Sequence, residues 1–235
     1  MKKHLCTGLA SGILMLGAAG LSQATSLIIT GVIDGPLPGG TPKAVELYAC
    51  NDISDLSDYG LGFANNGGGS DGIEFTFPAI SASAGDFLYV ASEKEEFFNF
   101  FGFAPDSTSS TATINGDDAI ELFKDATVVD VFGNIAVDGT GQAWEYLDGW
   151  AYRNDSTGGL DTSVFLMSEW YFSGPDALDN EIANLTAAHP FPAGSFSAGT
   201  PPQPVPTPEP ATILLLGSGL ACLTGKRLRS GRRKR

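Results

Sequence analysis

The 235-residue chain is acidic, with 27 Asp and Glu residues against 13 Lys and Arg residues and a formal net charge of −14. Most basic residues lie at the two ends, and the long middle part contains only Lys43, Lys94, Lys124 and Arg153. Such an acidic middle repels phosphate backbones, which argues against a nucleic acid partner. Cys50 is its single cysteine, which excludes an internal disulfide and a cysteine-based zinc site there.

The first 24 residues have the parts of a secretory signal peptide. Two lysines near the start are followed by an apolar stretch at Leu9–Leu21 and by the small-residue pattern of Ser22–Ala24. The apolar stretch is too short to span a membrane comfortably. We therefore expect a signal peptide over residues 1–24, cleaved between Ala24 and Thr25, and an exported mature chain.

Short apolar or alternating segments separated by Gly, Asn, Asp and Ser turns follow, and this pattern favours strands. We expect strands at Ser26–Ile33, Lys43–Ala49, Leu61–Phe63, Ile73–Phe77 and Phe87–Ser92. In the second of these strands, alternation places Glu46 on the opposite face from Val45 and Leu47. Ser92, followed by acidic residues and five phenylalanines, predicts a short helix that Ser92 caps and whose rings fill one end of the fold.

The stretch from Asn115 to Arg153 organises the rest of the chain. Its apolar runs at Ala119–Phe123 and Thr127–Phe132 are separated by a connection of hairpin length that lacks the usual glycine. Four large aromatic residues then need a surface to pack on, and we expect them to close over the hairpin: Trp144, Tyr146, Trp150 and Tyr152. Further on, we expect extended pieces at Val164–Met167 and Glu169–Phe172 and an apolar clip at residues 190–192.

Several segments resemble, in order, the lamin-tail domain in the form found in exported bacterial proteins. They are AVELY at 44–48, DLSDYGL at 55–61, GDFLYVA at 85–91, NGDDAIELFKDATVVDVFG at 115–133, WEY at 144–146, AYR at 151–153, and Trp170, Phe172–Pro175 and Asp179. Asp58 stands where the family has a glycine. The resemblance covers most of Leu27–Phe196. It implies an immunoglobulin-like β-sandwich that serves as a binding or attachment module and shares no catalytic residues.

The C-terminal residues resemble the PEP-CTERM sorting signal. Pro208, Glu209 and Pro210 precede an apolar stretch at 211–225 and a tail at 226–235 that contains seven Lys and Arg residues. A stop-transfer segment with a basic cytoplasmic tail places the sandwich outside the membrane. The resemblance implies processing at or near these three residues by an exosortase, a membrane protease/transpeptidase, in a Gram-negative host that secretes polysaccharide. An ordinary membrane anchor is the alternative.

The expected organisation is therefore an all-β chain with a segment at each end that is not part of the folded domain. We expect a signal helix at 1–24, an immunoglobulin-like sandwich of the lamin-tail type at 25–196 and a Pro-rich linker at 197–207. The sorting signal at 208–235 contains the expected transmembrane helix.

No catalytic constellation stands out. His189 is the single histidine of the mature soluble region and precedes a proline, so a Ser-His-Asp triad would have to use it as its base. The many carboxylates include no ordered pair typical of a glycosidase. We therefore expect a protein that is not an enzyme.

Two kinds of ligand remain open. Calcium prefers oxygen-rich loops such as those containing Asp52, Asp55 and Asp58 or Asp117 and Asp118, although such residues more often cap turns. Trp144 and Trp150, like Trp170, are large enough to stack on sugar rings, although core packing is the commoner role. No cofactor is expected beyond structural calcium.

The expected function is that of an exported, exosortase-processed protein of the cell surface or extracellular matrix, transiently anchored in the inner membrane. There it would act as a non-catalytic binding or structural module, with an extracellular polysaccharide or an envelope protein as its partner. The alternatives are an accessory domain to a secreted nuclease or phosphoesterase and a calcium-dependent carbohydrate-binding module.

Overall fold

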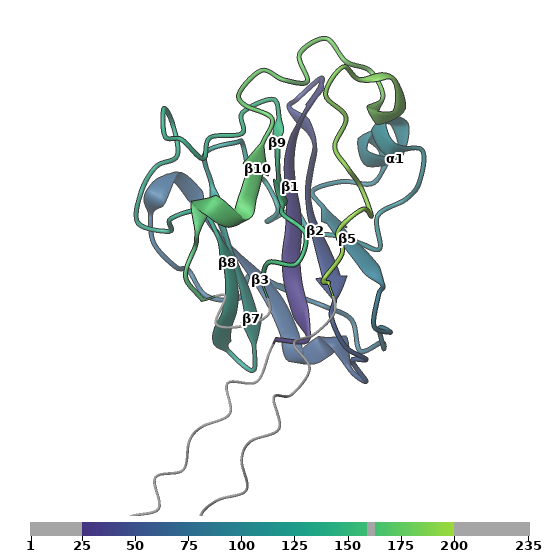
Figure 1. Cartoon of the computed structure of the whole chain (residues 1–235), viewed down its shortest axis with the longest axis vertical. Helices are drawn as coiled ribbons and strands as arrows, with labels where there is room; N and C mark the ends of the chain where they lie inside the picture. Colours follow the sequence, from purple (N-terminus) through teal and green to yellow (C-terminus); the bar gives the residue numbers. More distant parts are fainter. Residues whose placement is uncertain (1–24, 159–162, 200–235) are drawn as a thin grey trace, which may run out of the picture. The chain divides into compact units, whose positions relative to one another are not determined.

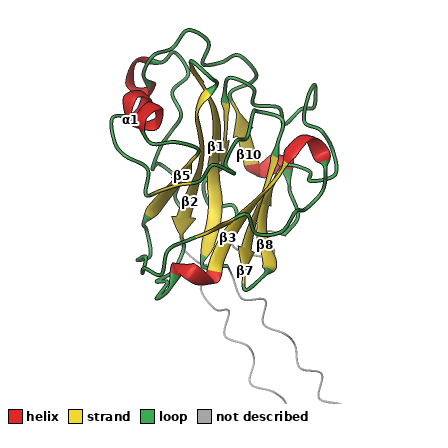
Figure 2. Ribbon diagram, turned by 180° about the vertical axis from the view of Figure 1, so that it is seen from behind, coloured by secondary structure: helices red, strands yellow, loops and turns green. Residues whose placement is uncertain are grey.

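The computed structural model describes residues 25–158 and 163–199, which fold as two facing β-sheets (Figure 1). The six-stranded sheet has the order β10-β9-β1-β2-β5-β6, and the four-stranded sheet has the order β4-β3-β7-β8. Helix is confined to one short α-helix and a few 3-10 turns among these residues (Figure 2). The prediction of a sandwich-like all-β fold is confirmed at this level.

The bounds of the elements are as follows. The large sheet comprises β1 (Leu27–Leu37), β2 (Thr41–Ala49), β5 (Phe87–Ala91), β6 (Ser107–Thr108), β9 (Trp150–Arg153) and β10 (Trp170–Phe172). The small sheet comprises β3 (Tyr59–Ala64), β4 (Phe75–Thr76), β7 (Ala119–Lys124) and β8 (Thr127–Phe132). The helical elements are α1 (Glu95–Phe101) and 3-10 turns at Leu56–Asp58, Asn65–Gly67, Met167–Glu169 and Asn184–Thr186.

Strand β1 is buried along most of its length because the large sheet is covered on both faces. Leu27, Ile29 and Val32 face the small sheet, while Ile28 and Ile33 face the opposite side. The pairing with β2 shifts register between Ile29 and Gly31. The shift places one extra residue in β1, which turns the Val32 side chain back toward the small sheet, because a one-residue slip exchanges the two faces of a strand.

Two apolar cores result. The first lies between the sheets and contains Val45 and Leu47 of β2 together with Ile120 and Leu122 of β7. The second lies on the outer face of the large sheet, where α1 and the segment around Phe191 cover it. The alternation predicted for the second strand is confirmed, since Ala44 belongs to the second core while Val45 belongs to the first.

The predicted β7–β8 hairpin is confirmed, with Lys124 paired to Thr127. Asp125 and Ala126 make its two-residue turn with φ angles of 49° and 62°. Both residues adopt the left-handed backbone conformation that this turn requires and that glycine usually supplies.

Three local predictions were wrong. The helix cap is not Ser92: α1 begins after Lys94, and the Glu93 carboxylate accepts a hydrogen bond from the Glu96 N–H instead. The extended piece expected at Val164–Met167 is cut short: Leu166 is extended, but a 3-10 turn begins at Met167 and includes Glu169. The aromatic segment divides: Trp144 and Tyr146 pack on Phe132 of the hairpin, whereas residues 150–153 form strand β9 beside β1.

The expected signal helix and C-terminal transmembrane helix lie outside the described residues. Within residues 25–158 and 163–199, no helix has the length and apolar character needed to cross a membrane.

Candidate functional site

A buried ion pair connects the two sheets. Nη2 of Arg153 donates to both carboxylate oxygens of Asp130 of β8 at 2.8 Å, and the Ile29 N–H donates to the same carboxylate at 2.7 Å. Arg153 also donates to the Ile29 carbonyl and to Glu169, and its guanidinium lies 4.6 Å from the centre of the Trp170 ring. Burial raises the pKa of Asp130 to about 6, although Arg153 opposes this shift. Arg153 and Asp130 thus satisfy one another and hold β1, β8 and β9 together.

A second buried carboxylate, Glu46, binds the C-terminal part of the domain. It accepts hydrogen bonds from Thr30, Tyr89 and Tyr152 and from the Gly194 N–H, all between 2.7 and 2.9 Å. The Tyr152 hydroxyl in turn accepts from the N–H groups of residues 195 and 196. Burial raises the pKa of Glu46 above its usual value. Every partner is part of the fold, so this cluster is structural.

Asp117, Asp118 and Trp144, which the sequence offered as ligand-facing residues, are buried. Asp117 accepts a hydrogen bond from the Thr140 hydroxyl, and Asp118 accepts from the N–H groups of Asn66 and Asn115. Burial raises the pKa of Asp118. The two carboxylates hold neighbouring turns in place, and Trp144 packs against Phe132.

Trp150 differs because its ring lines a groove. It is only 6% exposed, and its indole N–H donates to the His189 carbonyl. Tyr171, which is 57% exposed, lies 5.5 Å away between ring centres at an angle of 34°. The groove of about 340 Å³ is lined by Trp150, Tyr152, Arg153, Asn154, Asp155, Tyr171, Pro192 and Ser195. Aromatic and amide side chains of this kind suit a sugar ring.

Sequence reasoning missed Tyr171 as a site residue. The signal that could have found it is the alternation in β10, where Trp170 faces the core between the sheets and Tyr171 faces outward. A strand of three residues is too short for that alternation to be recognised from the sequence alone.

Of the proposed calcium residues Asp52, Asp55 and Asp58, the first two have local roles. Asp55 accepts from the Ser57 N–H and hydroxyl, which lowers its pKa, and Asp52 accepts from the Ala84 N–H. Among the described residues, the acidic group whose oxygens lie within 4.8 Å of one another is instead Asp148, Asp176 and Asp179. Burial, followed by the charges of Asp179 and Asp176, raises the pKa of Asp148.

His189 is exposed, and the hydrogen bond described for it uses its backbone carbonyl rather than its imidazole. Of the two residues at which signal cleavage is expected, Ala24 lies outside the described residues and Thr25 is the first residue that the structure describes. Pro208, Glu209 and Pro210 lie outside the described residues.

Comparison with protein families gives one match. The model of the PEP-CTERM protein-sorting motif matches residues 206–233. No curated protein and no solved structure matches the chain. The chain thus carries at its C-terminus a motif that indicates an exported protein, anchored in the membrane as a precursor and sorted by an exosortase.

Proposed function

We propose that this chain is a non-catalytic binding module of the cell surface or the extracellular polysaccharide matrix of a Gram-negative bacterium. Its sandwich is of the immunoglobulin-like, lamin-tail type. The observation that carries the proposal is the sorting motif at residues 206–233. This motif is an exosortase recognition signal, and in the sequence it follows a folded β domain. An exosortase processes the precursor at or near Glu209, and the domain then acts outside the cell.

The composition of the domain supports an extracellular binding role. Residues 25–199 contain 26 of the 27 acidic residues and four of the 13 basic residues. A surface of this charge stays soluble and repels nucleic acids. The groove lined by Trp150 and Tyr171 gives a carbohydrate ring the exposed Tyr171 side chain to contact, at the edge of the large sheet where β9 and β10 pair.

The sorting step is tested in a host that possesses an exosortase. Glu209→Ala is expected to leave the full-length precursor in the membrane fraction, whereas Gln203→Ala, in the linker before the matched motif, is expected to be processed normally. Immunoblots of membrane and culture fractions measure the outcome. Normal release of the Glu209→Ala variant would contradict the assignment.

Carbohydrate binding is tested on the exported protein with an array of matrix polysaccharides, in calcium and in chelator. Tyr171→Ala is expected to lower binding, while Phe98→Ala, a similarly exposed aromatic residue on α1, is expected to leave it unchanged. Loss of binding in chelator would favour the calcium-dependent module and direct attention to Asp148, Asp176 and Asp179. Absence of binding in both conditions would favour a protein partner, including a secreted nuclease, and co-purification would identify it.

A further inference from the structure

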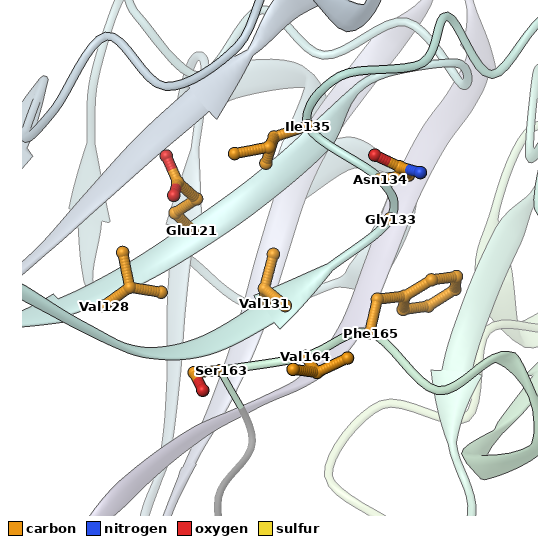
Figure 3. Close-up of a pocket in the computed structure, with 9 residues that line it drawn as sticks. All are labelled: Glu121, Val128, Val131, Gly133, Asn134, Ile135, Ser163, Val164 and Phe165. Atoms are coloured by element: carbon orange, nitrogen blue, oxygen red, sulfur yellow. The ribbon is translucent and has the colours of Figure 1, made fainter.

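A groove on the outer face of the small sheet combines apolar walls with a single buried carboxylate (Figure 3). Its volume is about 300 Å³. It is lined by apolar side chains, among them Val131, Ile135 and Phe165, and by three polar ones, Glu121, Asn134 and Ser163. They come from β7, β8, the turn after β8 and the segment that precedes the 3-10 turn at Met167–Glu169.

Strand alternation places Glu121 in this groove. Ile120 and Leu122 point into the core between the sheets, so Glu121 points to the other face of β7. Its neighbours across the ladder are Gly62 on β3 and Val131 on β8. Since Gly62 has no side chain, the cross-strand neighbours provide the Glu121 carboxylate with no polar partner.

The Glu121 carboxylate lacks the hydrogen bonds that every other buried carboxylate of the described residues receives. Glu121 is 4% exposed, and its Oε2 atom has no hydrogen-bond partner. The five others, Asp34, Glu46, Asp117, Asp118 and Asp130, each accept at least one hydrogen bond. A buried acceptor without a partner bears the full desolvation penalty, so an exception of this kind calls for a donor from outside the fold.

We propose that this groove binds an organic ammonium ion, a primary amine on a small ring or short chain. The –NH₃⁺ group donates to the Glu121 carboxylate, which lines the groove, and the body of the ligand lies against Val131, Ile135 and Phe165. A charge-assisted hydrogen bond in a partly apolar surrounding is stronger than one in water. A calcium ion would need six or more oxygen ligands, whereas the lining side chains of this groove are mainly apolar.

Size and charge both agree with this class of ligand. At about 30 Å³ for each water molecule, the groove has room for about ten waters, which is enough for a six-membered ring with its amino group. The domain contains 26 acidic residues and four basic ones, so its field attracts cations. Two sources share the chemistry, an apolar amine and an amino sugar.

Calorimetric titration of the full-length chain separates the two sources. The ammonium probes are cyclohexylamine and glucosamine, and their matched neutral probes are cyclohexanol and N-acetylglucosamine. We expect one or both ammonium probes to bind at least tenfold more tightly than their neutral counterparts. Tighter binding of cyclohexylamine identifies the apolar amine as the source, and tighter binding of glucosamine identifies the amino sugar. Equal binding of charged and neutral probes, or no binding by either amine, would overturn the proposal.

The site is located with a matched pair of variants. Glu121→Gln keeps the shape and removes the charge, and we expect it to weaken ammonium binding about ten- to a hundredfold. Glu95→Gln makes the same charge change at an exposed position on α1 and should leave binding unaltered. Unchanged affinity of Glu121→Gln would overturn the assignment.

Methyl NMR of the wild-type full-length chain gives a second reading that does not depend on any variant. The ammonium probe should shift the methyl resonances of Val131, Ile135 and Val164, which line the groove, and leave those of Leu185 and Ile182 in place, since both are exposed and neither lines the groove. Shifts confined to residues outside the groove would overturn the proposal.

Discussion

Two carboxylates on neighbouring strands of the small sheet have opposite surroundings. Asp130 of β8 faces the inter-sheet core and is completely buried, yet Arg153 and two backbone N–H groups satisfy both of its oxygens. Glu121 of β7 faces outward and is almost as buried, yet its Oε2 atom has no partner. In this molecule, the amount of burial therefore does not distinguish a structural carboxylate from one that is proposed to bind a ligand. The number of hydrogen-bond and ion-pair partners that the carboxylate has does distinguish them.

The difference has a topological origin. Asp130 faces the large sheet, and β9 of that sheet brings an arginine within reach. Glu121 lies on the face that no sheet covers, where the neighbouring wall is made by the segment at 163–165 and the turn after β8. These short pieces contribute apolar side chains together with Asn134 and Ser163, and none of them donates a hydrogen bond to Glu121 Oε2. The inner face thus stabilises its charge internally, whereas the outer face leaves a charge available to a ligand.

The largest expected effect comes from removing the partner of Asp130. Arg153→Leu leaves that carboxylate buried without its counter-charge and is expected to lower the free energy of unfolding by about 3–5 kcal/mol. Urea unfolding of the full-length chain, followed by tryptophan fluorescence, measures the change, because all three tryptophans lie in the β domain. Lys94→Leu removes an exposed cation as a control. If Arg153→Leu lowers the free energy of unfolding no more than Lys94→Leu does, the contrast between Asp130 and Glu121 does not hold.

The Glu46 cluster sharpens the comparison with a third buried carboxylate. Tyr152→Phe removes one donor to Glu46 and leaves two backbone N–H groups, at Ser195 and Phe196, without their acceptor. We expect a loss of about 3 kcal/mol. Tyr89→Phe removes a single hydrogen bond to Glu46 and should cost about 1 kcal/mol. Equal losses in the two variants, compared by urea unfolding, would show that the C-terminal segment is not held by Tyr152.

Unfolding experiments at acid pH test whether burial still destabilises the charged form of carboxylates that have hydrogen-bond or ion-pair partners. Burial raises the pKa of Asp34 from 3.8 to about 6, although its ion pair with Lys43 opposes the shift. The folded chain therefore binds this proton more tightly than the unfolded chain. Stability should increase by about 2–3 kcal/mol as the pH falls from about 6 to about 4, and the same stability is lost as the pH rises again.

Unfolding free energies at pH 4, 5, 6 and 7 measure this slope. Asp34→Asn should reduce it, because the variant side chain does not titrate, while Asp52→Asn, at an exposed position, is the matched control. An unaltered slope in Asp34→Asn would assign the pH dependence to Asp130 or Glu46, whose pKa values burial also raises.

The sequence predicted the positions of the strands better than it predicted which strands pair with one another. The alternation of the second strand and the two apolar runs of the hairpin were sufficient to place β2, β7 and β8, because a period of two is a local property. The position of β9 beside β1 was not predictable in this way, since residues 150–153 are few and aromatic, and their pairing spans more than a hundred residues. The Asp125 and Ala126 turn also lacks the glycine that normally announces it.

The candidate sites were harder to predict for the same reason. Aspartates in turns and large tryptophans attract attention in a sequence, yet Asp117, Asp118 and Trp144 serve the fold. Glu121 gave no signal, because a glutamate that alternates with Ile120 and Leu122 has the usual pattern of a solvated strand face. Only the residues that cover it, which follow it at 128–135 and 163–165, turn it into a buried charge.

The smallest expected effect is a gain in stability at Glu121. Glu121→Met replaces a buried acceptor that has no partner by an unbranched apolar side chain of similar length, and we expect the free energy of unfolding to rise by about 1 kcal/mol. The same change at Glu46, Glu46→Met, deprives four donors of their acceptor and should be strongly destabilising, which makes it the matched opposite. Urea unfolding compares the two variants directly. A destabilised Glu121→Met variant would mean that the fold itself depends on this charge, and the distinction between a charge held for the fold and a charge held for a ligand would no longer apply to these two strands.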